Sequence, residues 1–295
     1  MTTSTTTPQA PETAGDPASA SAAHQPSEPA FLLLKPDCLR SGLVEVVDRA
    51  VADAGLTVLC RHRVELTPSD VRFLWSEYNE RDHVLATAFL DRYLCDGPSE
   101  VVMVSGPDAF EATRRIKRDV RGRHARGIFA NVVHGSETRG ELTRQATLLL
   151  GRCAHCTDRF GAQSPVTNPL RPPGLAFRER FDVDQVVEDL WPRLEKGLAP
   201  PDPFPLSASP EAEPTSAAYL GVDSDNSLDS AVTAVWHALP GVELGHALML
   251  TLYAGRSGGH PIGVGTEKEA ERCHATLIEY GIKNCWYGAF PASSR

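Results

Sequence analysis

Hydrophobic positions in the first half of the chain alternate between short continuous runs and runs at helical spacing. The continuous runs predict buried strands at residues 31–34, 56–66, 100–105 and 128–133. Helical spacing follows at residues 43–54 and 107–118, and Thr67-Pro68-Ser69-Asp70 is a typical helix start. Because strands and helices alternate in the order βαβ…βαβ, the pattern predicts an α/β (α+β) protein with a ferredoxin-like βαββαβ sandwich.

The pattern changes in the second half, where a proline-rich stretch precedes a smaller set of elements. Residues 198–217 hold six prolines between Pro200 and Pro214, which predicts a semi-rigid, extended linker. Beyond it we expect one short strand from about Tyr219, a final strand at residues 283–290, and three helices between them. The helices are expected from about Ser227 and at residues 243–253 and 267–280. A unit of about 75 residues is long enough to fold alone.

Composition divides the chain into five segments. Residues 1–28 contain almost only Thr, Ser, Ala, Pro, Gln and Glu, which cannot bury enough apolar surface to fold, so a disordered tail is expected. The other segments are expected to be a large α/β domain at 29–150, an extension at 151–197, the linker at 198–217 and a small α/β domain at 218–295. Apolar residues at helical spacing in 183–194 predict an amphipathic helix, interrupted by Pro192, that either docks on the large domain or binds a partner.

Charge and composition exclude several classes of function. With a net charge of −9, general affinity for nucleic acid or for an anionic membrane is not expected. The longest apolar run, residues 30–34, is far too short to span a membrane, and residues 1–28 lack the features of a secretory signal. The seven cysteines are an odd number, which favours free thiols in a reducing compartment. A cytoplasmic protein without a membrane or nucleic-acid partner is therefore expected.

Candidate chemistry concentrates in the stretch Asn131-Val132-Val133-His134-Gly135-Ser136-Glu137. The densest cationic run of the chain lies just upstream, at Arg114, Arg115, Lys117, Arg118, Arg121, Arg123 and Arg126. Lys35 follows the first predicted strand. A neutral imidazole among fixed cations suits phosphoryl transfer, because the barrier falls mainly through positioning and charge neutralisation. The same residue types also fit a structural histidine beside a solvated arginine face.

Several motifs lie in a fixed order along this half of the chain. They are Leu34-Lys35-Pro36-Asp37, Arg40-Ser41-Gly42-Leu43-Val44, Gly97-Pro98 and Asn131-x-x-His134-Gly135-Ser136. With them, residues 30–150 resemble the nucleoside diphosphate kinase family. The resemblance implies that His134 carries the γ-phosphoryl group of a nucleoside triphosphate to a nucleoside diphosphate or a specialised acceptor, with Mg²⁺ on the phosphates. It further implies binding roles for Lys35, Tyr78, Arg115, Arg121 and Asn131, and supporting roles behind the histidine for Ser136 and Gln145.

The sequence departs from this family's pattern at three places. Only five residues separate Arg115 from Arg121, where the family has a longer loop that supplies a phosphate-site threonine and an oligomer contact. Gln145 stands where the family has a glutamate that orients the histidine. Arg81 and His83 are the nearest substitutes for a further family arginine. Because one lost donor costs on the order of 10²–10³ in rate, the alternative is a catalytically weak or silent nucleotide-binding protein.

A pair of cysteines follows the kinase-like segment. Cys153-x-x-Cys156 has the spacing of half a zinc site. The other cysteines of the first half are scattered through expected strands and loops, at Cys38, Cys60 and Cys95. Because no second half is evident in the sequence, free thiols are expected, and metal binding by Cys153 and Cys156 is the less favoured alternative.

The last segment carries motifs of its own. They are Ala247-Leu248-Met249-Leu250, Gly263-x-Gly265-Thr266, Glu269-Ala270-Glu271 and Gly281. With them, residues 218–292 resemble the ClpS-type adaptors of bacterial Clp proteases, and the C-terminal domain of the ribosomal stalk protein is an equal fold analogue. The resemblance implies a protein or peptide partner. It does not extend to the adaptors' amino-group site, because Tyr253 replaces a histidine and only Asp223 matches an Asn-Asp-Asp run.

Overall fold

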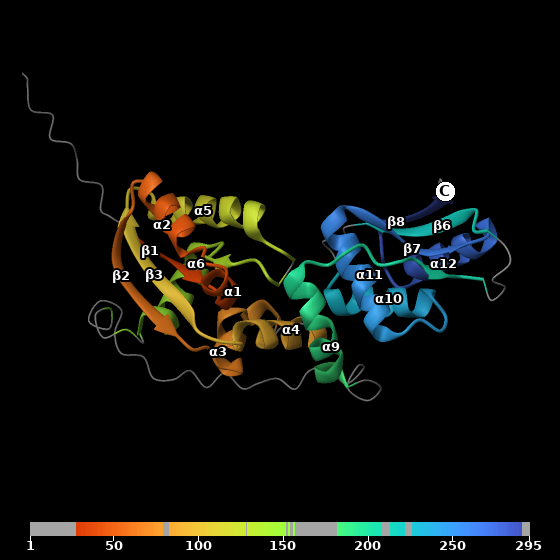
Figure 1. Ribbon diagram of the computed structural model, residues 1–295, viewed down its shortest axis with the longest axis horizontal. Coiled ribbons are helices and arrows are strands. Elements are labelled where there is room, and N and C mark those ends of the chain that lie inside the picture. Colours follow the sequence, from red (N-terminus) through yellow and green to blue (C-terminus); the bar gives the residue numbers. More distant parts are fainter. Residues whose placement is uncertain are drawn as a thin grey trace, which may run out of the picture.

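A computed structural model of the chain describes residues 28–78, 83–127, 129–151, 153, 156, 182–207, 213–221 and 226–290. The expected tail before residue 28, together with Arg81 and Asp223, lies outside these residues. Two units lie end to end, with helix α9 (Val183–Lys196) between them (Figure 1). In the described part of the chain, no helix combines the length and the apolar character needed to cross a membrane.

The first unit is built on a four-stranded antiparallel sheet. Its strands are β1 (Glu28–Leu34), β2 (Thr57–Val64), β3 (Ser99–Gly106) and β4 (Val133–His134), in the order β2-β3-β1-β4. With β1 and β3 in the centre, this order is the ferredoxin-like βαββαβ arrangement that the sequence predicts. Leu32 and Leu34 of β1 face one core, while Phe31 and Leu33 face the other. Because both faces of β1 are buried, its sequence is a continuous run of apolar residues.

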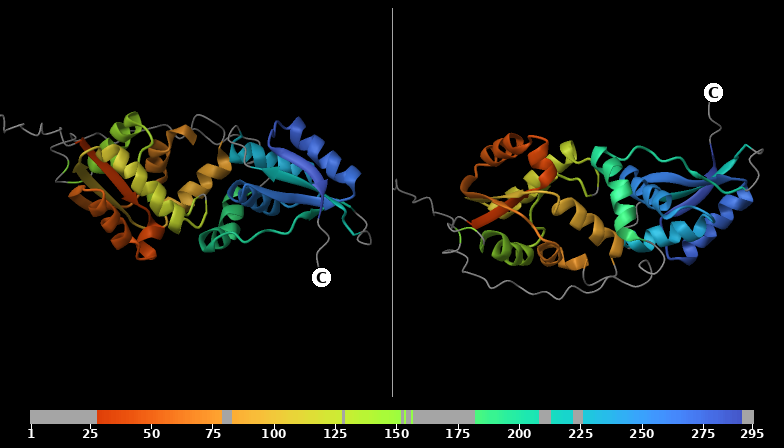
Figure 2. Two further views of the ribbon diagram at one scale, coloured as in Figure 1. Left: turned by 90° about the horizontal axis from the view of Figure 1, so that it is seen from above. Right: turned by 60° about the horizontal axis from the view of Figure 1, so that its bottom comes forward.

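Helices cover both faces of this sheet, as the views in Figures 1 and 2 show. One face carries α2 (Val44–Asp53) and α5 (Ala109–His124), and the other carries α3 (Pro68–Leu74), α4 (Val84–Leu94) and α6 (Arg139–Gly151). The short helices α1 (Pro36–Arg40) and η1 (Ser76–Tyr78) lie in the connections. α5 continues without a break to His124, beyond its predicted end at Arg118. This continuity decides which arginines can reach the functional site.

The second unit holds a four-stranded sheet in the order β5-β7-β6-β8. Its elements are β5 (Phe204–Pro205), β6 (Ser216–Gly221), α10 (Leu228–Ala238), α11 (Leu244–Ser257), β7 (Gly259–Gly265), α12 (Glu267–Glu279) and β8 (Cys285–Ala289). The pattern misses β7, because its glycines leave few apolar positions to alternate. The stretch predicted as a linker contains β5, which pairs in parallel with β7. The likeness to ClpS-type adaptors stays a prediction.

Helix α9 joins the two units. It runs through Pro192 to Lys196, so the predicted interruption at this proline does not occur. Its buried residues pack against α4 of the first unit and α11 of the second. The ring of Trp191 lies 5.6 Å from the ring of Tyr93, measured between centroids. α9 is therefore part of the core between the units.

A buried carboxylate links the two units directly. Asp229, near the start of α10, accepts hydrogen bonds from the backbone N–H groups of Leu85 at 2.9 Å and Ala86 at 3.5 Å. These groups belong to the first turn of α4, where a helix has no internal acceptors. Asp229 is therefore a cap that one unit supplies to a helix of the other. Burial raises the pKa of this carboxyl to about 6.

Replacing Asp229 with alanine is expected to lower the free energy of unfolding by about 1–2 kcal/mol at pH 5, since a helix cap is lost. The pKa of Asp229 is raised in the folded protein, so its contribution is greatest in acid and declines as the pH rises through about 6. The difference between the two proteins should thus shrink from pH 5 to pH 7. Urea unfolding at both pH values measures it, with the exposed Glu279→Ala as control. A difference that grows with pH would refute this account.

Candidate functional site

A pocket of about 470 Å³ is lined by residues of both units. From the first unit come Lys35, Trp75, Tyr78, Lys117, Arg121, Asn131 and His134, and from the second come Asn226, Ser227 and Leu228. The pocket thus brings together most of the residues that the sequence singles out. Ser136 and Gln145 lie buried behind it.

A strained turn sets the position of His134. Val132 has a φ of 58°, which is rare for a β-branched residue, and the N–H of Val133 donates to the carbonyl of Asn131 at 2.7 Å. The N–H of Val132 donates to Asp37 Oδ2 at 3.2 Å, and its carbonyl accepts from the N–H of Lys35 at 2.9 Å. Extended pairing with β1 therefore begins only at Val133, and the predicted strand at 128–133 shrinks to β4.

Gln145 determines which nitrogen of His134 carries the proton. Its Nε2 donates to the carbonyl of Leu74 at 2.8 Å, which fixes the orientation of the amide. Its Oε1 lies 3.0 Å from His134 Nε2 and accepts from Ser136 Oγ at 2.9 Å. Because an amide oxygen can only accept, the proton of a neutral ring resides on Nε2. The lone pair is then on Nδ1, which has no hydrogen-bond partner among the described residues.

Three cations border the histidine. Lys35, only 2% exposed, donates from Nζ to Asn131 Oδ1 at 2.5 Å. Lys117 donates from Nζ to the carbonyl of Gly135 at 2.7 Å and also pairs with Glu137. Arg121 donates from Nε to the carbonyl of Val133 at 2.8 Å. Two of the three cations are thus held by backbone carbonyls next to His134.

Arg115 does not reach this pocket. It lines a separate cavity between α2 and α5, which includes Arg49 and Asp53. Arg115 and Arg121 are six residues apart on one continuous helix, so their side chains leave it about 120° apart, whereas those of Lys117 and Arg121 are about 40° apart and share a face. The predicted placement of Arg115 beside His134 is therefore corrected, and Lys117 stands there instead.

Helical spacing is the signal that identifies Lys117 from the sequence. Because the family's loop is missing, the cationic run is expected to form one helix. On one helix, two cations that are four residues apart can reach the same site, whereas two that are six residues apart cannot. Trp75 is a second residue that the sequence did not single out. Its ring lies 4.9 Å from that of His134. Tyr78 lines the same pocket and contacts His83 edge-on, with ring centroids 5.1 Å apart.

Burial and like charge shift the titration of the site. Burial lowers the pKa of His134 well below its usual value of 6.5, and the neighbouring positive charge of Lys35 lowers it further. Burial also lowers the pKa of Lys35, with Arg121 adding to the effect. The pocket therefore holds a neutral imidazole beside Lys35, Lys117 and Arg121, while Glu77, Glu137 and Glu141 also line it. Glu137 is paired with Lys117, and Glu141 accepts from backbone N–H groups, so the cations beside His134 can still attract an incoming anion.

The titration of His134 offers a direct check. With its pKa lowered, the ring stays neutral at pH 6.5 and gains a proton only in more acidic solution. NMR titration of the ring signals, assigned by their loss in His134→Ala, is expected to give a midpoint well below 6.5. A midpoint at or above 6.5 would show that the ring is not held in a buried, positively charged site.

Sequence comparisons agree with the resemblance of the first unit. A family model described as nucleoside diphosphate kinase matches residues 28–154. The chain is 26% identical over 121 residues to the nucleoside diphosphate kinase of Bartonella tribocorum, covering 38% of this chain and 84% of that protein. It is 29% identical over 139 residues to that of Streptococcus uberis, covering 42% of this chain and 94% of that protein.

A solved structure of a nucleoside diphosphate kinase from Halobacterium salinarum, in complex with CDP, is also similar. It shares 21% identity and a TM-score of 0.38, covering 42% of this chain and 87% of that one. The sequence matches confirm the predicted resemblance for residues 28–154 and support nucleotide phosphotransfer at low identity over this part of the chain.

Proposed function

We propose that the chain is a phosphotransferase in which His134 takes the γ-phosphoryl group of a nucleoside triphosphate and passes it to a second substrate. The observation that carries the proposal is that Nδ1 of His134 has no hydrogen-bond partner among the described residues and lies in a pocket with Lys35, Lys117 and Arg121. A nucleophile and fixed cations in one pocket are what phosphoryl transfer needs.

In the first half-reaction, Nδ1 of His134 attacks the γ-phosphorus. A P–N bond forms while the bond to the β–γ bridging oxygen breaks, and the nucleoside diphosphate leaves with the bond's electron pair. Lys35, Lys117 and Arg121 neutralise charge on the transferring group. Gln145 keeps accepting the Nε2 proton, so the ring does not rotate as it becomes an imidazolium. The second half-reaction reverses these steps on an acceptor oxygen.

Mg²⁺ fits this scheme as an ion that arrives on the nucleotide. Glu137 pairs with Lys117, and Glu141 accepts from the backbone N–H groups of Glu137 and Thr138. These carboxylates are engaged, so phosphate oxygens and water are the expected ligands. When bound, the ion supplies further neutralisation of the phosphates.

The second unit can influence which acceptor receives the phosphoryl group. Asn226 and Ser227 of the second unit line the pocket beside the kinase-like residues. Any acceptor that enters would contact both units, which favours a specialised acceptor over an ordinary nucleoside diphosphate. Screening acceptors against the labelled protein, with Asn226→Ala as the test variant, checks this. An unchanged acceptor preference in the variant would count against a role for the second unit.

Incubation with γ-labelled ATP and Mg²⁺ tests the function itself. The proposal predicts a protein-bound label that is stable in alkali and lost in acid, and that added acceptor removes. Calorimetry of nucleotide binding distinguishes this proposal from the alternative of a silent nucleotide-binding protein, which would bind nucleotide without becoming labelled. Absence of label with every common nucleoside triphosphate would reject the proposed transfer.

A further inference from the structure

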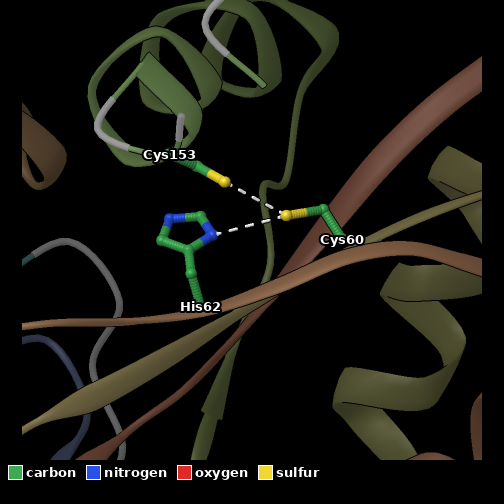
Figure 3. Close-up of side chains that lie close together, drawn as sticks. All are labelled: Cys60, His62 and Cys153. Atoms are coloured by element: carbon green, nitrogen blue, oxygen red, sulfur yellow. Dashed lines mark hydrogen bonds between the residues drawn. The ribbon is translucent and has the colours of Figure 1, made fainter. Parts of the chain in front are cut away.

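Three side chains of the types that ligate metals form a cluster outside the pocket around His134. Cys60 and His62 of β2 meet Cys153, which follows α6, and their sulfur and nitrogen atoms all lie within 4.8 Å of one another (Figure 3). The Sγ atoms of Cys60 and Cys153 are 3.2 Å apart, and His62 Nδ1 is 3.9 Å from Cys60 Sγ. All three groups converge on one point.

Strand geometry explains why Cys60 and His62 act together. Residues two apart on a strand point to the same face, and both side chains are half-buried while Arg61 between them is exposed. A register shift between Val58 and Cys60 bends β2 just before this pair. β2 is an edge strand, so its far side has no neighbouring strand in the described sheet.

Cys156 is a candidate for a fourth donor next to this cluster. The N–H of Cys156 donates to the carbonyl of Cys153 at 2.9 Å, which holds the two cysteines close together. The Cys156 side chain is buried beside this cluster, although its Sγ is not among the three ligand atoms that all lie within 4.8 Å of one another. It also contacts Met103 Sδ at 3.8 Å. The Cys-x-His pair on β2 can therefore supply the second half of the zinc site that the Cys153-x-x-Cys156 spacing lacks.

The His62 ring is oriented as a metal ligand would be. Its Nε2 lies 2.9 Å from the carbonyl of Leu149, which can only accept, so Nε2 carries the proton. The lone pair of Nδ1 then points toward the sulfur atoms. A histidine that ligates a metal commonly donates its other N–H to a backbone carbonyl in this way.

We propose that Cys60, His62, Cys153 and Cys156 bind one Zn²⁺ ion in a tetrahedral site. Zinc–sulfur bonds of about 2.3 Å place neighbouring ligand atoms about 3.8 Å apart. The observed separations of 3.2 and 3.9 Å bracket this value, so small shifts suffice for Cys60, His62 and Cys153. Cys156 would complete the site by turning its Sγ away from Met103 Sδ, which it now contacts at 3.8 Å. A Cys60–Cys153 disulfide would use only two of the four groups. The zinc ion would tie the chain after α6 to the edge of the sheet.

Metal content of the full chain tests the site. Protein purified under reducing conditions in the presence of Zn²⁺ is expected to hold one zinc ion per chain by plasma mass spectrometry. Cys60→Ser and Cys153→Ser should lose it, while Cys95→Ser, at an exposed cysteine elsewhere, should retain it. His62→Cys should also retain the ion, because a four-cysteine site suits zinc equally well. This rescue guards against mistaking misfolding for loss of a ligand.

Replacement by Co²⁺ gives a second readout. Thiolate ligands are expected to produce a sulfur-to-cobalt charge-transfer band and intense visible bands typical of tetrahedral cobalt, both absent in Cys153→Ser. The proposal is overturned if added Zn²⁺ is not retained, if Cys60→Ser keeps full zinc content, or if thiol counting of fresh protein finds a Cys60–Cys153 disulfide. None of these readouts depends on phosphate transfer, so they test the zinc site independently of the proposed function.

Discussion

Replacing His134 with alanine is expected to reduce phosphate incorporation from γ-labelled ATP to background. His134 lines the pocket, its Nε2 is held by Gln145, and its Nδ1 has no partner in the part of the chain that the structure describes. A second histidine, His83, also lines the pocket, but Lys117 and Arg121 are held by the backbone carbonyls on either side of His134. The labelled protein is separated from nucleotide by gel filtration and counted.

His124→Ala is the matched control for this variant. His124 is at the end of α5 and lines the separate cavity near α2, so its loss should leave the label unchanged. Calorimetric binding of nucleotide shows whether His134→Ala still forms the pocket. Full labelling of His134→Ala would contradict the assignment of the nucleophile.

Arg121→Ala is expected to lower the rate of labelling by about 10²–10³-fold, because a positioned cation that neutralises the transferring group is lost. Arg115→Ala should label at a rate close to that of the wild type. The two arginines belong to one helix, but only Arg121 lines the phosphate pocket. Single-turnover labelling at saturating nucleotide measures both variants.

Comparing the labelling rates of Arg121→Ala and Arg115→Ala distinguishes a specific role of Arg121 in the site from a general effect of positive charge. Circular dichroism of each variant checks that its helices are intact. Equal losses in both variants would mean that the net charge of α5, and not the position of Arg121, controls the reaction. A loss confined to Arg115→Ala would restore the role that the family resemblance implies.

Local patterning predicts the first unit well for a physical reason. β1 is buried on both faces, so its run of apolar residues stands out, and the helices that follow have one apolar side. The short β4 is less evident, because it depends on the positive φ of Val132 and on contacts with Asp37 that are distant in sequence. Strain of this kind leaves no local sequence pattern.

Some placements of site residues likewise follow from the local sequence pattern, whereas others depend on tertiary structure. Lys35, Asn131 and His134 meet as expected, because strand ends bring them together. Arg115 lies elsewhere, because without the family's longer loop Arg115 and Arg121 belong to one continuous helix. The pairing of Cys60 with Cys153 spans the sheet edge and the end of α6, so only tertiary structure reveals it. Similarly, only the fold shows that Asn226 reaches the pocket of the other unit.

The site of phosphate attachment on the His134 ring tests the central claim most directly. Phosphorus NMR of the labelled, denatured protein in alkali distinguishes phosphate on Nδ1 from phosphate on Nε2. Because Gln145 occupies the Nε2 side, the account predicts a single signal from Nδ1-phosphohistidine. A signal from Nε2-phosphohistidine, or phosphate on any other residue, would contradict it.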